Sequence, residues 1–188
     1  MGKYRPAVIL TLALTVFLAS CKGTSDDPKS WVVSTLAGST LGHHDATGTE
    51  AAFYKPHGVA VDSSGNLYVA DAYDNRIRKI TSAGVVSTLA GSGTRGFANT
   101  GDTDADDNLL EPRFDFPTGV AVDSSGILYV ADARNHRIRK ITSAGVVTTL
   151  AGSGTYGHHD ATGTVAQFRY PYGVAVDSSG NVLSLIHI

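Results

Sequence analysis

The segment GVAVDSSG occupies residues 58–65, and it returns at residues 119–126 and 173–180 of this 188-residue chain. A second segment, RIRKITSAGVV, follows the first two copies at residues 76–86 and 137–147. Both segments are offset by 61 residues between their first and second copies. A fixed internal period of this length indicates a fold that is built from repeated supersecondary units.

Each unit contains four short runs that are typical of β-strands. In the first unit the expected strands are residues 59–61, 67–70, 76–81 and 85–89. β-branched and aromatic residues fill these runs, and clusters of Gly, Asp, Asn and Ser separate them. In the DSSG breaks the glycine supplies a positive φ, while Asp or Ser can hydrogen-bond the local backbone. Beyond the N-terminal apolar segment, the sequence shows no helical period of useful length.

Tandem units of four antiparallel strands are typical of β-propellers. A small sheet cannot bury both of its faces alone, whereas stacking against neighbouring sheets covers them. The sequence therefore predicts an all-β fold, a β-propeller of four-stranded antiparallel blades with about two full blades plus partial ones. Closed propellers have about 4–8 blades, so the propeller is incomplete in this chain. We expect residues 32–37 to form an isolated fourth strand that would complete the last blade of a longer chain.

The blade pattern resembles the NHL-repeat family, which takes its name from an Asn-His-Leu motif. The matching run here is Asn135-His136-Arg137-Ile138, within GVAVDSSGILYVADARNHRIRKI. The earlier unit has DNRI at residues 74–77, which departs mildly from the same motif. The resemblance covers residues 31–181 and implies the fold, but it implies little about activity because propellers host many functions.

The N-terminus has the features of an export signal. A short positive region precedes an apolar run of 13 residues, 7–19, and polar sequence follows. A membrane-spanning helix needs about 20 apolar residues, so this run has the length of a signal-peptide core instead. The run LASC ends at Cys21 and resembles the lipobox of bacterial lipoproteins, in which the cysteine is lipidated. The alternative is an ordinary secretory signal that is cut near Ala19 or Ser20.

These features predict a lipoprotein-type signal peptide at residues 1–20 and a polar tether at residues 21–30. The expected location is the bacterial cell envelope, with the chain lipid-anchored outside the cytoplasm at the outer membrane or cell surface. At the other end, the sequence of residues 182–188 no longer matches the repeat, and the mismatch begins within an expected strand. We expect a truncated or spurious end there. The alternative is a genuine short protein that assembles blades between chains.

Composition excludes several classes of function. The chain has 15 Lys and Arg against 17 Asp and Glu, for a net charge of −2, which argues against a globally basic nucleic-acid binder. A single cysteine excludes a disulfide framework and a Cys-rich zinc site. Basic stretches do occur on the expected third strands. There, Arg and Lys can lay their stems over neighbouring blades and pair with Asp71 or Asp132.

Two loops with the sequence GHHDATGT carry the most metal-like groups. Their candidate ligands are His43, His44, Asp45, His158, His159 and Asp160. Imidazole and carboxylate groups suit zinc, nickel or iron. Adjacent residues of an extended loop point in different directions, however, and a solvated loop with a turn-forming Asp is the alternative. The sequence therefore predicts no cofactor, with a divalent metal ion as a weak candidate.

Residues 102–106 resemble the start of an EF-hand calcium-binding loop, but the later positions do not match its consensus. The EF-hand consensus requires Gly at its sixth position and Glu at its twelfth. Those positions hold Asp107 and Arg113 here, so a solvated acidic loop is the expected structure and weak calcium binding is the alternative.

Propeller topology places the turns between second and third strands on the same face as the loops that join successive blades. That face is where we expect a ligand. Its expected residues are Asp71, Asp74, Asn75, Arg76, Asp132, Asn135, His136 and Arg137.

No serine-nucleophile motif, phosphate loop or zincin motif occurs, so no catalytic residue is assigned and an enzyme is the less favoured class. The prediction is an exported, lipid-anchored NHL-repeat propeller that binds or scaffolds a protein, peptide or glycan, with no nucleic-acid partner. The alternative is part of a propeller enzyme, such as a metal-dependent lyase or a lactonase-like hydrolase. A third hypothesis is the sensor head of a larger envelope protein.

Overall fold

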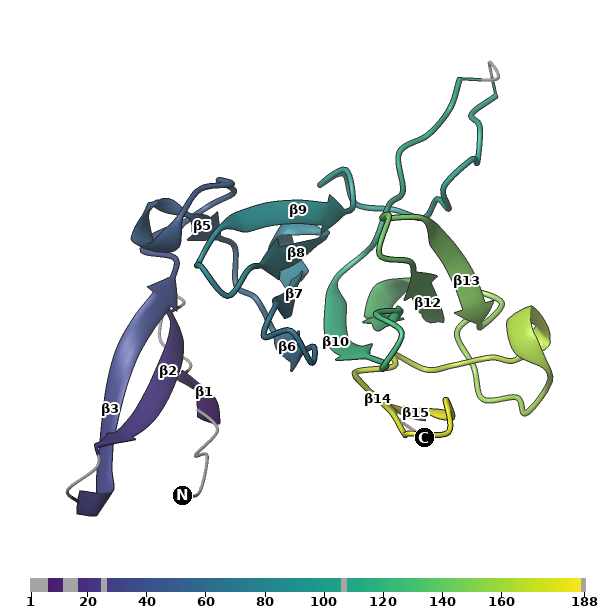
Figure 1. Cartoon of the computed structure of the whole chain (residues 1–188). Helices are drawn as coiled ribbons and strands as arrows, with labels where there is room; N and C mark the ends of the chain where they lie inside the picture. The colour runs from purple at the N-terminus through teal and green to yellow at the C-terminus, as the bar shows by residue number, and fades with distance from the viewer. Residues whose placement is uncertain (1–6, 12–16, 25–26, 106–107, 187–188) are drawn as a thin grey trace.

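Two four-stranded antiparallel sheets form the centre of the molecule (Figure 1). The computed structural model describes the backbone of residues 7–11, 17–24, 27–105 and 108–186, and the side chains of these residues from Val33 onward. The first sheet contains β6 (Gly58–Val61), β7 (Leu67–Asp71), β8 (Arg76–Ile80) and β9 (Val86–Ala90). The second contains β10 (Pro117–Val122), β11 (Leu128–Asp132), β12 (Arg137–Ile141) and β13 (Val147–Ala151). Each sheet follows chain order, which confirms the four-stranded repeat units.

A third unit begins with β14 (Gly173–Val176) and β15 (Val182–Leu185), which pair as the first two strands of a blade. The first strands β6, β10 and β14 lie side by side. Their approach is so close that a Cβ on Gly58 would lie 2.3 Å from the Thr118 carbonyl oxygen. A Cβ on Gly119 would lie 2.7 Å from the Tyr172 carbonyl oxygen. The glycine that opens each GVAV strand therefore permits the blades to meet at their inner strands.

Apolar residues fill the space between successive sheets. One buried cluster joins residues of both central sheets, including Tyr68, Ile77 and Val130. A second cluster covers the other face of the first sheet, where Phe53 packs among residues such as Leu67. Each sheet thus hides its faces against its neighbours, which confirms the propeller-blade arrangement.

Short elements lie between the strands. The parallel pair β4 (Thr40–Leu41) and β5 (Ala52–Phe53) and the 3-10 helices η1 (Gly48–Glu50) and η4 (Gly163–Val165) lie in loops that precede a blade, whereas η2 (Ala72–Asp74) and η3 (Ala133–Asn135) lie between the second and third strands of the two full blades. The DSSG turns form as expected from the sequence. Asp62 accepts hydrogen bonds from the backbone N–H groups of Ser64 and Asn66, both at 2.9 Å, and Gly65 has a φ of 82°.

Three N-terminal strands form a separate antiparallel sheet in the order β1 (Ala7–Thr11), β2 (Phe17–Thr24) and β3 (Asp27–Ala37). The prediction that residues 32–37 form an isolated strand is wrong, because they belong to β3 and pair with β2. That they complete the last blade of a longer chain stays a prediction. Pairing satisfies backbone groups that an isolated strand would leave open. Cys21 lies in β2 opposite Val33.

The predicted cleavage before Cys21 stays a prediction. Such cleavage would remove β1 and the first half of β2. Lys3 and Arg5, the positive region of the predicted signal, lie outside the described residues. His187 also lies outside them, and the origin of residues 182–188 stays a prediction although β15 occupies part of that range. Within the described residues, no helix has the length and apolar character needed to cross a membrane.

Candidate functional site

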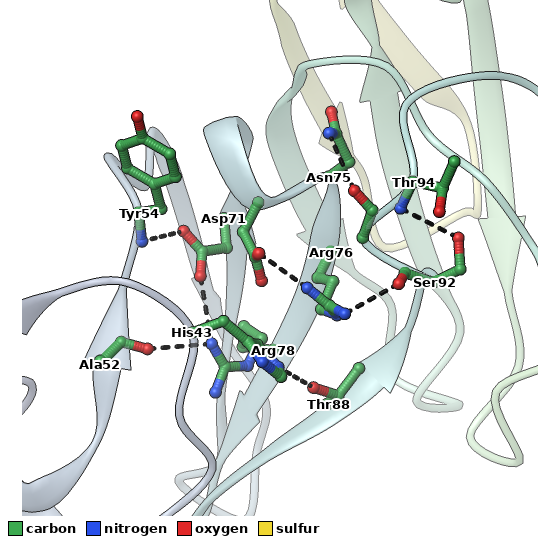
Figure 2. Close-up of polar contacts among 12 residues, drawn as sticks. His43, Ala52, Tyr54, Asp71, Asn75, Arg76, Arg78, Thr88, Ser92 and Thr94 are labelled. Atoms are coloured by element: carbon green, nitrogen blue, oxygen red, sulfur yellow. Dashed lines mark hydrogen bonds and ion pairs between the residues drawn. The ribbon is translucent and has the colours of Figure 1, made fainter.

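A buried arginine on the third strand of each blade joins that blade to the loop that precedes it. Arg78 is fully buried and donates to the Asp71 carboxylate at 3.1 Å. The same guanidinium donates to the carbonyl oxygens of Ala52 and His44, each at 3.1 Å. Asp71 in turn accepts a hydrogen bond from the Tyr54 backbone N–H at 2.8 Å (Figure 2). One ion pair therefore satisfies carbonyl and amide groups of the loop that precedes the blade.

The second blade repeats this arrangement. Arg139 donates to Asp132 at 2.9 Å and to the carbonyl oxygens of Arg113 and Ala98 at 3.1 and 2.7 Å. Asp132 accepts from the Asp115 backbone N–H at 2.9 Å. These contacts confirm the expectation that third-strand arginines pair with Asp71 or Asp132.

Burial dominates the electrostatics of both carboxylates. It raises the pKa of Asp71 to about 7 and that of Asp132 to about 6, while the neighbouring arginine in each blade opposes the shift. Both side chains are completely shielded from solvent. Asp71 and Asp132 were expected on the ligand face, but they lie beneath it and hold the loops that form it.

The loop around His43, His44 and Asp45 is tied to the same arginine. Asp45 pairs with the Arg78 guanidinium and accepts the Thr88 backbone N–H at 2.9 Å. Burial raises the pKa of Asp45, but the Thr88 hydrogen bond and the charge of Arg78 outweigh it and leave that pKa below its usual value. The His43 Nε2 atom lies 3.3 Å from the Thr88 Oγ1 atom (Figure 2).

The two predicted histidine loops do not combine into a metal centre. Throughout the part of the chain that the structure describes, no three His, Cys, Asp or Glu side chains gather to hold a metal ion. His158, His159 and Asp160 are exposed, and the backbone of His159 pairs with Gln167. Asp45 carries an ion pair with Arg78 instead, a role that only the structure reveals. In the second blade Arg139 donates to Asn99, which stands in the equivalent place, at 3.0 Å.

In the acidic loop, Asp102 accepts the Asn99 backbone N–H at 2.7 Å, and Asp104 accepts that of Asn108 at 3.0 Å. Asp106 and Asp107 lie outside the described residues.

The other predicted face residues connect the turn after each second strand to the loops beside it. Asp74 pairs with Arg76 at 2.7 Å, and Arg76 donates to the Ser92 carbonyl oxygen at 2.8 Å (Figure 2). Asn75 accepts the backbone N–H of Phe116 at 3.0 Å, which links one blade to the next.

The second blade makes equivalent connections. Asn135 donates to the Gly96 carbonyl oxygen at 2.7 Å, and Arg137 donates to that of Ser153 at 2.8 Å. His136 accepts the Tyr170 backbone N–H at 3.3 Å. Burial lowers the pKa of His136, as it lowers that of His57, so both imidazoles favour the neutral form.

Aromatic side chains, which were not expected from the sequence, cover these turns. Tyr73 lies 5.5 Å from Tyr54 and 5.1 Å from Phe116 between ring centroids, and His57 lies 5.0 Å from Phe116. A second group repeats one blade further on. There, the rings of His136 and Tyr156 both contact Tyr170, with distances between ring centroids of 4.8 Å for His136–Tyr170 and 5.8 Å for Tyr156–Tyr170. We call this surface the aromatic face, and its members are Tyr54, His57, Tyr73, Phe116, His136, Tyr156 and Tyr170.

Backbone strain accompanies the aromatic face. Lys55, Phe116 and Tyr170 have φ values of 50°, 57° and 46°, and each precedes a proline at the same place in its repeat. Bulky side chains rarely adopt this left-handed conformation, which costs on the order of 1–3 kcal/mol per residue. In the sequence these three positions show only as bulky residues that each precede a proline, at Pro56, Pro117 and Pro171, and the strain itself is visible only in the structure.

Residues 53–80 and 114–141 each match the family model described as NHL repeat. The chain is a member of the NHL-repeat family. It is 30% identical over 162 residues to NHL repeat-containing protein 2 from Bos taurus, a match that covers 77% of this chain and 22% of that protein. It is 34% identical over 102 residues to the protein SUPPRESSOR OF QUENCHING 1, chloroplastic, from Arabidopsis thaliana, covering 54% of this chain and 9% of that one. The chain therefore spans less than a quarter of the length of these curated relatives.

Solved structures show the same fold. A protein of unknown function from Bacteroides thetaiotaomicron superposes with a TM-score of 0.65 at 22% identity, over 90% of this NHL-repeat chain and 40% of that chain. An auxiliary nutrient binding protein from Bacteroides ovatus gives a TM-score of 0.61 at 15% identity, over 90% and 42%. A chain of a nidogen/laminin complex gives 0.59 at 14% identity, over 95% and 52%. These likenesses establish a propeller fold.

Replacement of Arg78 tests the buried ion pair. We expect Arg78→Ala to lower the free energy of unfolding by about 3–5 kcal/mol, because it leaves the Asp71 carboxylate buried without its counter-charge. Lys79→Ala on the same strand should cost less than about 1 kcal/mol, since Lys79 is partly exposed. Urea unfolding followed by circular dichroism measures both variants. Equal losses in the two would contradict the assigned role of Arg78.

Two phenylalanines separated by one residue test the difference between core and face. Phe114→Ala should cost about 3–5 kcal/mol, because Phe114 is fully buried between the blades. Phe116→Gly should change stability by less than about 1 kcal/mol, because relief of the left-handed strain offsets the lost ring contacts. Thermal unfolding of both variants gives the comparison. A loss for Phe116→Gly as large as that for Phe114→Ala would show that Phe116 serves the core.

Proposed function

We propose that this chain is part of an exported, lipid-anchored NHL-repeat propeller that binds or scaffolds a protein, peptide or glycan on its aromatic face. The observation that carries the proposal is the set of bulky side chains at positive φ before Pro56, Pro117 and Pro171. Such strain persists only when the surrounding structure imposes it, and it gathers at ligand sites.

Exposure of the face supports the same function. Tyr73 and Tyr156 keep 43% and 50% of their surface in solvent although each touches other rings. Tyrosine combines a large apolar surface with a polar hydroxyl, and it is enriched where proteins bind partners. The buried carboxylates beneath the face, by contrast, are committed to Arg78 and Arg139 and are unavailable to a ligand.

The structural relatives favour binding in general. One is described as an auxiliary nutrient binding protein and another belongs to a nidogen/laminin complex. Both share only the fold with this chain. They support a role in which a propeller face holds another molecule.

Defined compounds can test the binding role directly. The purified full chain would be screened against a panel of oligosaccharides and synthetic peptides by calorimetry. We expect at least one compound whose affinity falls about tenfold or more in the double variant Tyr73→Ala/Phe116→Gly, because removing an aromatic anchor costs above about 1 kcal/mol. The matched control is Lys79→Gln/Lys140→Gln, on the third strands, which should bind as the wild type does. Compounds that bind the face variant unchanged would exclude the aromatic face as the site.

Anchoring has its own test at Cys21. The variant Cys21→Ser should fail to incorporate labelled palmitate and should move from the membrane fraction to the soluble fraction of a bacterial host, because its lipid attachment atom is gone. Ser30→Ala in the predicted tether is the control and should remain in membranes. Unchanged fractionation of Cys21→Ser would refute lipid anchoring. It would not bear on the binding role, which the screen of oligosaccharides and peptides tests separately.

A further inference from the structure

Two arginines share one carboxylate at the edge of the aromatic face. The Arg95 Nε atom lies 2.7 Å from Asp115, and the Arg134 Nη1 atom lies 3.8 Å from it. The side chains of Arg95 and Arg134 are 67% and 43% exposed, whereas that of Asp115 is only 11% exposed. One carboxylate neutralises one of two positive charges, so this group presents excess positive charge to solvent.

The same surface carries other cations. The Lys55 Nζ atom stands 4.6 Å from the centroid of Tyr73, the Arg134 guanidinium 4.7 Å from that of Phe116, and the Arg169 guanidinium 5.3 Å from that of Tyr156. Lys55, Arg134 and Arg169 are all exposed.

The acidic turns lie at the opposite end of the strands. Asp62, Asp123 and Asp177 occupy the turns after the first strands, whereas the aromatic face lies at the turns after the second strands. The chain has a net charge of −2, yet the group of Arg95, Arg134 and Asp115 at the edge of its aromatic face carries one net positive charge. Charge complementarity therefore favours an anionic partner for this face.

The angles between the rings favour an acidic protein segment over a nucleic acid or an anionic glycan as the partner. Phe116 meets His57 and Tyr73 at interplanar angles of 67° and 77°, and Tyr156 meets Tyr170 at 75°. In such edge-to-face pairs the ring planes are steeply inclined to one another, so the rings do not share the common orientation on which successive bases or sugars would stack. Tyrosine beside arginine is instead the composition of the energetic centre of protein–protein interfaces.

We propose that the aromatic face binds an acidic segment of a partner protein, with a carboxylate bound by the exposed parts of the Arg95 and Arg134 guanidinium groups beside Asp115. Guanidinium and carboxylate groups match in charge and planar geometry and can form paired hydrogen bonds. Apolar groups of the same segment would pack on Tyr73 and Phe116. This inference rests on the proposed binding function and names its ligand class.

A random copolymer of glutamate and tyrosine is a suitable probe because it carries both features. The full chain should bind it with an affinity that falls as salt increases, since exposed charges are screened. Polygalacturonate and single-stranded oligothymidylate serve as the anionic glycan and nucleic-acid comparisons, and both should bind more weakly than the copolymer. Fluorescence anisotropy with labelled probes gives all three affinities.

The variant Arg95→Gln/Arg134→Gln should weaken copolymer binding about tenfold or more, because it removes both charged donors. The control Lys79→Gln/Lys140→Gln removes the same charge elsewhere and should stay within about twofold of wild type. The triple variant Arg95→Gln/Asp115→Asn/Arg134→Gln guards against misfolding, since it leaves no unpaired carboxylate, and it should show the same loss. Thermal unfolding of each variant accompanies the binding measurement.

Unchanged copolymer binding in both arginine variants would overturn the proposed carboxylate site. Tighter binding of polygalacturonate or oligothymidylate would overturn the acidic protein segment as the ligand while leaving a binding role for the face. Absence of copolymer binding to the wild type would also overturn this inference, and the panel with Tyr73→Ala/Phe116→Gly would still decide the proposed function separately.

Discussion

The buried pairing of a third-strand arginine with a second-strand aspartate is the interaction on which the rest of this structure depends. Arg78 and Arg139 each reach from within a blade to carbonyl oxygens of the loop that precedes the blade. A buried charge must find partners, because leaving it unpaired costs several kcal/mol. The loops are therefore fixed in the position on the blade that gives the buried arginine its hydrogen-bond partners. The side chains of the aromatic face, which these loops carry, are fixed with them.

Rigid loops explain how the aromatic face can hold strained residues. Phe116 is fixed on one side by Asp115, whose backbone N–H meets Asp132, and by its own N–H bond to Asn75. The following proline restricts the backbone further. With these constraints in place the left-handed conformation does not relax, and the ring stays among Tyr73 and His57. Preorganisation of this kind reduces the entropy lost when a ligand binds.

The repeats divide their positions between frame and surface. Positions that hold the frame are the same in both full units, as with the aspartates, the third-strand arginines and the opening glycines. Positions on the aromatic face differ, since Lys55, Phe116 and Tyr170 occupy one repeat position and Tyr73 and Arg134 occupy another. Identical blades can therefore present a surface that changes from blade to blade. The propeller supplies the geometry, and the variable positions supply the chemistry.

The amino-acid sequence alone determined the strands, the turns and the four-stranded units, because alternating apolar residues and DSSG turns act through local backbone preferences. It also indicated that Arg and Lys side chains of the third strands can pair with Asp71 or Asp132. Only the tertiary structure decided that Asp71 and Asp132 are buried. It also decided that Asp45 forms an ion pair with Arg78, and that Arg95 and Arg134 both form ion pairs with Asp115. Those contacts join residues from separate loops, and their distances depend on how one blade packs against the next. A repeat pattern specifies which residues return, but the packing of blades about an axis specifies which of them meet.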